Sequence, residues 1–267
     1  MSLTIFSTAD FANHFSALGL RKGDDVILHS KLTSFALVPG GASSAYNGLR
    51  EVVGNTATIV VPTYCFQLSE DDVYDPQATP SQNMGVISEY VRKLPNAVRS
   101  SCPIHNHSAI GDKAAELSEI EGNVSFGPKS DFSWLSSHDF KLVLLGCGFI
   151  EAGTQVFHAM ANIGVPYRGW HHLPRKRQNK NGYIEKVDVR YYARNSGEFE
   201  NIKTNYSIAY RATSQSVVER FNQTLRKMIA KYIQADTLQR EENPAGPRMQ
   251  PWPDVVPVML ANYNSNI

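Results

Sequence analysis

The chain has 267 residues, of which 42% are hydrophobic and 19% are charged, so it can bury a full core and lacks the composition of a disordered protein. Its formal net charge of +1 creates no overall field for nucleic acid or membrane, so any charged partner must be recognised by a local patch. The N-terminus shows no basic stretch followed by an apolar one, and no segment approaches the roughly 18 apolar residues of a membrane span. We expect a soluble, cytoplasmic protein without a membrane partner.

Three cysteines, Cys65, Cys102 and Cys147, are widely spaced, and none forms a C-x-x-C pair. An odd number at such spacing argues against a disulfide framework and against a zinc site. We therefore expect reduced thiols and no metal.

The first part of the chain predicts a strand, helix, strand unit that follows an N-terminal helix. Cap residues and apolar residues at helical spacing predict a helix over 7–18, and a second helix over 43–53 ends at Gly54. Strands are predicted over 26–29 and 58–61.

Helices and strands continue to alternate farther along the chain. The pattern predicts helices over 84–94 and 113–120 and an extended segment over 97–100. The apolar run 141–145 predicts a central strand buried on both faces, and the alternating segment 185–192 predicts a half-solvated edge strand. The expected fold class is α/β, a layered α/β/α sandwich with a central, mostly parallel sheet.

From about residue 206 the character of the sequence changes. An apolar stripe from Val218 to Tyr232 marks a long basic helix, a Pro/Gly-containing linker covers 240–251, and a shorter helix covers 252–263. We therefore expect a main α/β domain over 1–205 and a C-terminal helical appendage over 206–267.

Two segments carry residues suited to chemistry. Residues 26–35 predict a buried strand that runs into a polar turn, and residues 154–168 predict a helix that opens with Thr154 and carries His158 one turn later. Threonine and histidine then share one helical face. A histidine on an apolar helix face is more often a packing residue than a proton acceptor, although its reference pKa near neutrality suits proton transfer.

Six segments, taken in chain order, give the region 3–203 a resemblance to the aminoglycoside 3-N-acetyltransferase family. These segments are 18–32, 56–63 ("TATIVVPT"), 75–85 ("DPQATPSQNMG"), 97–111 ("AVRSSCPIHNHSAIG"), 126–130 ("FGPKS") and 144–148 ("LLGCG"). Each match alone would be weak, whereas six collinear matches over three quarters of the chain form a strong signal.

The resemblance implies an acyltransferase that moves an acetyl group from acetyl-coenzyme A, as co-substrate, directly to an amine of an amino sugar or aminoglycoside-like small molecule. That activity would belong to antibiotic resistance. It implies that His158 is the general base and that Thr154 lies beside the reacting sulfur or carbonyl. It further implies that the coenzyme is held by His29, Ser30, Lys31, Leu32, Gly40 and Gly41. Candidate substrate-binding residues are Asp75, His105 and His107, the two histidines being either pocket lining or surface residues.

Two departures from the family pattern are visible. Ala161 stands three residues after His158, where the family usually has a glutamate that can orient the ring, and Cys102 stands where drug-modifying members often have histidine. Cys147, between two glycines, could form an acyl-cysteine, but no basic residue neighbours it in sequence, and we favour a structural role.

Residues 211–267 resemble the last part of a retroviral or transposon-type integrase core, with Glu219 at the third metal-binding carboxylate. One glutamate cannot hold two metal ions, so integrase activity is not expected. The alternative to an active enzyme is an inactive acetyltransferase remnant fused to an integrase-derived, nucleic-acid-binding fragment. A homodimer could instead cover the apolar stripe. Basic residues available to nucleic acid are Arg211, Arg220, Arg226, Lys227 and Lys231.

Overall fold

The structure is a computed structural model that describes residues 5–165 and 168–195. These residues fall within one compact unit of the chain, 1–195. The predicted helical appendage over 206–267 lies outside the described residues. In the described part of the chain, no helix is both long and apolar enough to cross a bilayer.

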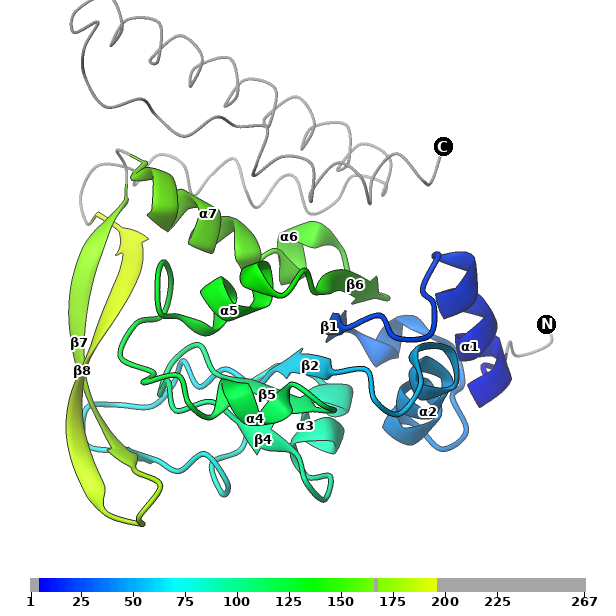
Figure 1. Cartoon of the computed structure of the whole chain (residues 1–267), viewed down its shortest axis with the longest axis horizontal. Helices are drawn as coiled ribbons and strands as arrows, with labels where there is room; N and C mark the ends of the chain where they lie inside the picture. Colours follow the sequence, from blue (N-terminus) through cyan, green and yellow to red (C-terminus); the bar gives the residue numbers. More distant parts are fainter. Residues whose placement is uncertain (1–4, 166–167, 196–267) are drawn as a thin grey trace, which may run out of the picture. The chain divides into compact units, whose positions relative to one another are not determined.

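A five-stranded sheet forms the centre of this unit, with the strand order β4-β5-β2-β1-β6 (Figure 1). β1 pairs in parallel with β2 and β6, whereas β5 is antiparallel to both β2 and β4, so four of the five strands run in one direction. The strands are β1 (Val26–Ser30), β2 (Ile59–Pro62), β4 (Val98–Arg99), β5 (His107–Ile110) and β6 (Lys141–Leu145).

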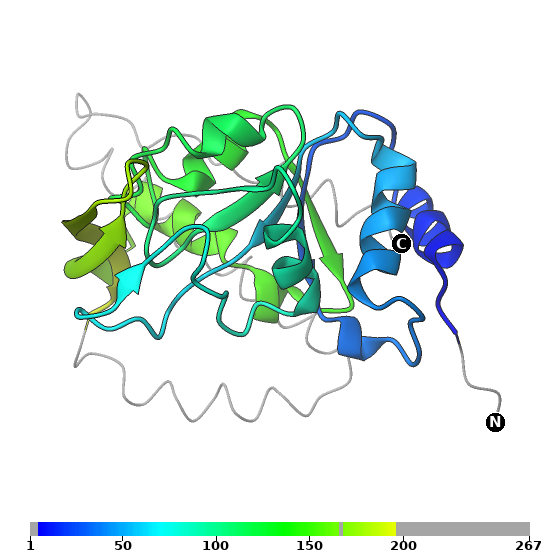
Figure 2. The same cartoon turned by 90° about the horizontal axis from the view of Figure 1, so that it is seen from below.

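Helices cover both faces of this sheet, as the alternation of side chains along its strands requires. In β1, Val26 and Leu28 join a core with α1 (Thr8–Ala17), α2 (Ala42–Val53) and α3 (Val86–Arg92). Ile27, between them, joins the opposite core, to which α4, α5 and α7 contribute. The bounds of these helices are α4 (Ala114–Leu117), α5 (Asp131–Ser137) and α7 (Gln155–Ile163); the short α6 (Phe149–Ala152) precedes α7. Figure 2 shows the helical layers on either side of the strands, and the predicted mixed α/β architecture is confirmed.

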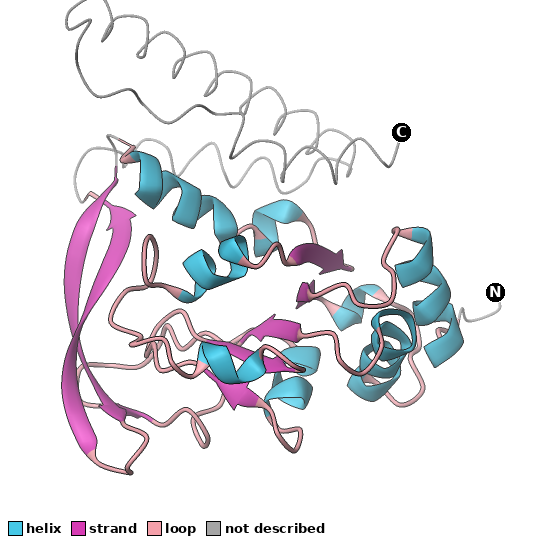
Figure 3. Cartoon of the chain, in the orientation of Figure 1, coloured by secondary structure: helices cyan, strands magenta, loops and turns pink. Residues whose placement is uncertain are grey.

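A second, three-stranded sheet has the order β3-β7-β8 and contains β3 (Val73–Tyr74), β7 (Arg168–Gln178) and β8 (Ile184–Arg194). β7 and β8 form the long antiparallel ribbon that stands beside the central sheet in Figure 3. Exposed and covered residues alternate along β8, so the predicted edge strand is confirmed.

The strand predicted over 141–145 is present, but the prediction that it lies at the centre of the sheet is wrong. β6 is the outermost strand after β1 in the described sheet, not a central one. Its side chains still face helices on both sides, because Val143 and Leu145 pack in one core and Leu142 packs against the other. Because its side chains are covered on both faces, this edge strand has the continuous apolar sequence that is typical of a central strand.

Candidate active site

The N-terminus of α7 lies over the carboxyl ends of two parallel strands. His29 is near the end of β1, and Tyr64 follows β2 by two residues, so both stand at the same edge of the sheet. Thr154, the residue before α7, acts on Tyr64: burial raises the pKa of Tyr64, and the Thr154 side chain opposes that shift. Gln155 places its Nε2 atom 3.1 Å from Nε2 of His29. Segments distant in sequence thus meet at the end of the sheet where α/β proteins usually bind ligands.

The helix predicted to open with Thr154 and to carry His158 is confirmed. Thr154 occupies the N-cap position of α7, and its side chain makes no capping hydrogen bond. The helix ends at Gly164, whose φ of 69° is the left-handed conformation common at helix C-termini.

His158 is held by contacts at both ring nitrogens. Its Nδ1 atom accepts a hydrogen bond of 3.0 Å from the backbone N–H of Gly127, and its Nε2 atom lies 3.1 Å from the side-chain amide of Asn162. Burial lowers the pKa of His158 to about 4, so the ring is neutral near pH 7. Because Nδ1 is an acceptor, the ring proton of the neutral form is on Nε2. Asn162 accepts this proton only when its amide presents the oxygen in place of the Nδ2 atom at 3.1 Å.

Asn162 is a polar partner of His158 that the sequence alone did not lead us to expect. The family pattern drew attention to the position three residues after His158, which is occupied by Ala161. On a helix the residues three and four positions ahead lie on the same face, so an amide at the fourth position can reach the ring when the third has no polar group. That spacing was the signal that could have identified Asn162.

A buried polar network adjoins Thr154. His107 places Nδ1 2.9 Å from Oδ2 of Asp131, and its Nε2 atom lies 3.2 Å from the Tyr64 hydroxyl. The Ser100 hydroxyl also donates to Oδ2 of Asp131, over 2.5 Å. All four side chains are at most 2% exposed. Of these four, only His107 was a candidate site residue from the sequence.

His105 and His107 are both buried, so the surface alternative for them is wrong. The His105 ring stacks on Tyr191 with an interplanar angle of 6° and packs against Phe126. Its Nδ1 atom has no hydrogen-bond partner in the described structure, and burial lowers its pKa well below the usual value.

Asp75 is committed to its own loop. Its Oδ1 atom accepts hydrogen bonds from the backbone N–H groups of Gln77 and Ala78, at 2.7 and 3.1 Å. These bonds form a local turn after β3. The Oδ1 atom of Asp75 is therefore occupied by backbone N–H groups of its own loop.

The predicted coenzyme-binding turn leaves the sheet at the end of β1. Ser30 ends that strand, the Lys31 N–H donates to the Leu145 carbonyl over 2.9 Å, and Leu32 begins the 3-10 helix η1 (Leu32–Ser34). Gly40 and Gly41, with φ of 80° and 57°, form the turn that starts α2. Positive φ at both positions favours glycine.

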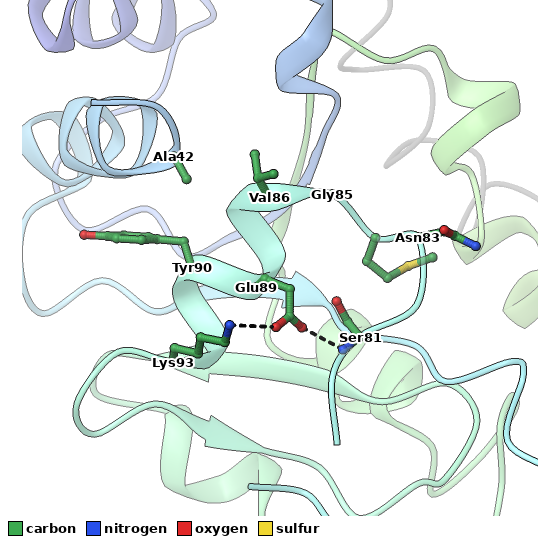
Figure 4. A pocket seen from close by; sticks show the side chains of 9 residues that line it. Ala42, Ser81, Asn83, Gly85, Val86, Glu89, Tyr90 and Lys93 are labelled. Carbon is green, nitrogen blue, oxygen red and sulfur yellow. Dashed lines mark hydrogen bonds and ion pairs between the residues drawn. The ribbon is translucent and has the colours of Figure 1, made fainter. Parts of the chain in front are cut away.

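A pocket of about 540 Å³ adjoins this turn. Ala42, next to Gly41, lines one side, and Gly85 lines it where a Cβ atom would lie 3.1 Å from the Ser30 carbonyl oxygen. Its lining, shown in Figure 4, consists of Ala42, Ser81, Asn83, Met84, Gly85, Val86, Glu89, Tyr90 and Lys93.

The pocket contains a fixed negative charge at Glu89. Burial opposes ionisation, yet hydrogen bonds from Arg92 and from Ser81 lower the pKa of Glu89 to about 2. Arg92 and Lys93 pair with the carboxylate at 2.8 and 3.6 Å. The charge is therefore balanced within α3.

None of the three cysteines, all of which lie in the described part of the chain, forms a disulfide. Cys65 and Cys102 are buried, and burial raises the pKa of Cys102 to about 12, which keeps it protonated. Cys147 follows β6 and has intermediate exposure.

The comparisons place this architecture in a family. A family model described as aminoglycoside 3-N-acetyltransferase matches residues 27–229, more than half of the chain. The chain belongs to this family, whose named members are acyltransferases. The predicted membership is confirmed.

Individual relatives agree with this assignment. Aminoglycoside N(3)-acetyltransferase VII of Streptomyces paromomycinus is 31% identical over 174 residues, which are 58% of this chain and 60% of that protein. The crystal structure of aminoglycoside acetyltransferase AAC(3)-Xa has a TM-score of 0.66 at 24% identity and covers 73% of this chain and 75% of its own. AAC-IIIb in a binary complex with CoASH has a TM-score of 0.64 at 20% identity, covering 73% and 78%. The chain spans about three fifths of the length of the curated relatives it matches.

The assignment of the C-terminal segment requires a correction. The family match runs to residue 229, so it includes 206–229, the first part of the segment that we expected to be an integrase-like tail. An integrase origin of 211–267 is not supported. Glu219, the basic residues and the apolar stripe of that segment lie outside the described residues.

Proposed function

We propose that this protein transfers the acetyl group of acetyl-coenzyme A to an amine of an aminoglycoside or a similar amino sugar. The observation that carries the proposal is the placement of Thr154 and His158 on α7, which lies over the carboxyl ends of β1 and β2. Family membership supports the reaction class. A structural relative was solved with CoASH and another with sisomicin, which supports the two substrate classes.

The coenzyme is proposed to bind along the turn that follows β1. His29, Ser30, Lys31 and Leu32 would flank its reactive arm, and the pocket beside Gly41 offers space next to this turn. The pocket is formed by residues from both α2 and α3, so one ligand there would contact the two helices together.

His158 is proposed as the proton acceptor for the attacking amine. The amine nitrogen forms a bond to the thioester carbonyl carbon, the carbon–sulfur bond breaks, and the amine loses a proton as the coenzyme thiolate leaves. A pKa of about 4 supports a ring that is already unprotonated at neutral pH. Since Nε2 carries the ring proton, the amine's proton would bind at Nδ1 and replace the hydrogen bond from Gly127.

The test is thiol release from acetyl-coenzyme A with sisomicin, gentamicin and glucosamine as acceptors. Wild type should release thiol only when an acceptor is present, and His158→Ala should reduce kcat by about 100-fold or more, the usual effect of losing a general base. His172→Ala is the matched control, because the His172 side chain is 62% exposed and pairs with Asp188 on the ribbon. If His158→Ala released thiol at the wild-type rate, His158 would not be the general base. Binding of acetyl-coenzyme A without turnover of any acceptor would contradict the proposed reaction.

A further inference from the structure

We propose that the side-chain oxygen of Gln155 accepts a hydrogen bond from the attacking amine, using the N–H that His158 does not deprotonate, and that this contact selects primary amines. The inference rests on the proposed acetyl transfer and adds to it a residue that orients the acceptor. Two observations carry it. Nε2 of Gln155 lies 3.1 Å from Nε2 of His29, and Oε1 of Gln155 is buried without a hydrogen-bond partner in the described structure.

His29 orients the Gln155 amide. An amide nitrogen only donates hydrogen bonds, so the Nε2 atom of His29 is the acceptor in this contact. The ring can accept because burial lowers the pKa of His29 to about 3, which leaves it neutral near pH 7. His29 is 5% exposed and belongs to β1, so the amide is attached to the central sheet. Because the amide is planar, fixing its nitrogen also fixes the direction of its oxygen.

The oxygen of the same amide lacks a donor. A buried carbonyl oxygen without a hydrogen bond is unfavourable, and nearly all such atoms in proteins have a partner. Gln155 as a residue has intermediate exposure, so its side chain is not sealed inside the core. An N–H group of a bound substrate supplies the donor that the protein itself does not.

Gln155 and His158 lie on one face of α7. They are three positions apart, and residues at this spacing are neighbours on the surface of a helix. Gln155 also contacts His29, which precedes the turn proposed to hold the coenzyme. Its amide therefore lies between the proposed proton acceptor and the proposed thioester site. The attacking nitrogen must occupy this same region.

The chemistry of a primary amine fits two acceptors at this place. The neutral amine has two N–H groups and one lone pair, which must face the thioester carbon as the new bond forms. One N–H gives its proton to His158, and the other remains on nitrogen and becomes the N–H of the product amide. A bond from that second N–H to Gln155 fixes the remaining direction around the nitrogen before attack. A hydroxyl group or a secondary amine has only one hydrogen and cannot bind both residues.

A pair of acceptors tests this contact. Wild type should acetylate glucosamine about tenfold faster, in kcat/KM, than N-methylglucosamine, whose amine has one N–H; this is the effect of one net hydrogen bond. Gln155→Met has a similar shape without the amide, so it should slow glucosamine about tenfold, leave N-methylglucosamine unchanged and abolish the preference.

Two further variants separate the oxygen from other effects of the substitution. Gln155→Glu keeps an acceptor oxygen but loses the donation to His29, so it should retain the preference for glucosamine. Gln178→Met, at the last residue of β7, is the matched control and should leave both rates unchanged. A preference of wild-type size in Gln155→Met would overturn the proposal, because shape alone would then exclude the methyl group.

A second set of measurements does not depend on turnover. NMR of ¹⁵N-labelled histidine at pH 7 should show the His29 ring, identified by its loss in His29→Phe, unprotonated at Nε2. A proton at this nitrogen would mean that Gln155 turns its oxygen toward His29, and the proposal would fail even in an active enzyme. Calorimetry with coenzyme A present should show that Gln155→Met binds glucosamine about tenfold more weakly than wild type. That loss in a protein that acetylates none of the acceptors would support the Gln155 contact while the proposed reaction fails.

Discussion

The backbone N–H of Gly127 points at Nδ1 of His158 from 3.0 Å and thereby fixes which nitrogen of the ring carries a proton. A turn between α4 and α5 thus sets the chemistry of a side chain on α7. The opposite nitrogen faces Asn162, one helical turn ahead. Neither of these two contacts is with a carboxylate. Burial is the cause that lowers the pKa of His158.

The pH dependence of the wild-type enzyme should reflect this. A base must be unprotonated, and the pKa of His158 is lowered to about 4, so kcat/KM should show no loss from this ring between pH 8 and pH 5 and should fall only toward pH 4. Rates with one acceptor measured across this range, beside acetyl-coenzyme A binding at each pH, provide the check. An acidic limb at pH 6.5 would show that burial does not lower the pKa of the ring.

Asn162→Asp should move that acidic limb upward. A carboxylate at this position would accept the Nε2 proton and stabilise the imidazolium, raising the pKa of His158 by about 1 to 3 units. The limb of kcat/KM should shift by the same amount. Asn162→Ala, which supplies no charge, should keep the limb near its wild-type position. An identical shift in both variants would mean that loss of the amide, rather than the new charge, alters the ring.

Acid should destabilise the fold through its buried histidines. Burial lowers the pKa of His29 to about 3 and that of His105 well below 6.5, so the unfolded chain binds these protons first as the pH falls. Stability present above pH 6.5 is therefore lost as the pH decreases toward the folded-state values. Urea unfolding at pH 7 and pH 4.5 should show that His105→Phe loses less of its unfolding free energy over this interval than wild type does. Equal losses would contradict the assignment, and exposed His172→Gln is the control.

Gly146→Ala should be far more damaging than Gly164→Ala. Both residues have positive φ, 67° and 69°, and should each lose ~1 kcal/mol of stability from that conformation. An added Cβ at Gly146 would also lie 2.8 Å from the Lys31 carbonyl oxygen and from the Phe35 ring, whereas at Gly164 nothing lies within 4 Å. We expect a further loss of ~1–3 kcal/mol at Gly146 from overpacking, measured by urea unfolding.

The same Gly146 variant should weaken coenzyme binding, because the clash displaces the turn that contains Lys31. Calorimetric titration with acetyl-coenzyme A checks this, and Gly164→Ala should bind as wild type does. Unchanged binding by a folded Gly146→Ala would separate this turn from the coenzyme site.

Sequence analysis was most successful for contacts between residues that lie within a few positions of each other in the chain. The capping box of Ser7 and Asp10 marks the start of α1, and the spacing of Thr154 and His158 on one helix follows from residues four apart. Tyr64 and His107 are 43 residues apart, and only the pairing of β2 with β5 brings them together. Such contacts have no local pattern to reveal them.

β7 was missed for a different reason. Its sequence, "RGWHHLPRKRQ", is basic and contains a proline, which favour neither a helix nor a strand by local pattern. Pairing over its whole length with β8 stabilises it as a strand. The partner strand, β8, could be predicted from its own sequence, because its polar and apolar residues alternate regularly.

Two hydrogen bonds attach α7 to the rest of the site: Gln155 contacts His29 of β1, and His158 contacts the turn before α5. A rotation of this helix about its axis would therefore disturb both attachments together. Mutations that alter how α7 packs, even on its far side, should displace Thr154 and His158 together and impair proton removal, so an inhibitor would need to displace only this one helix.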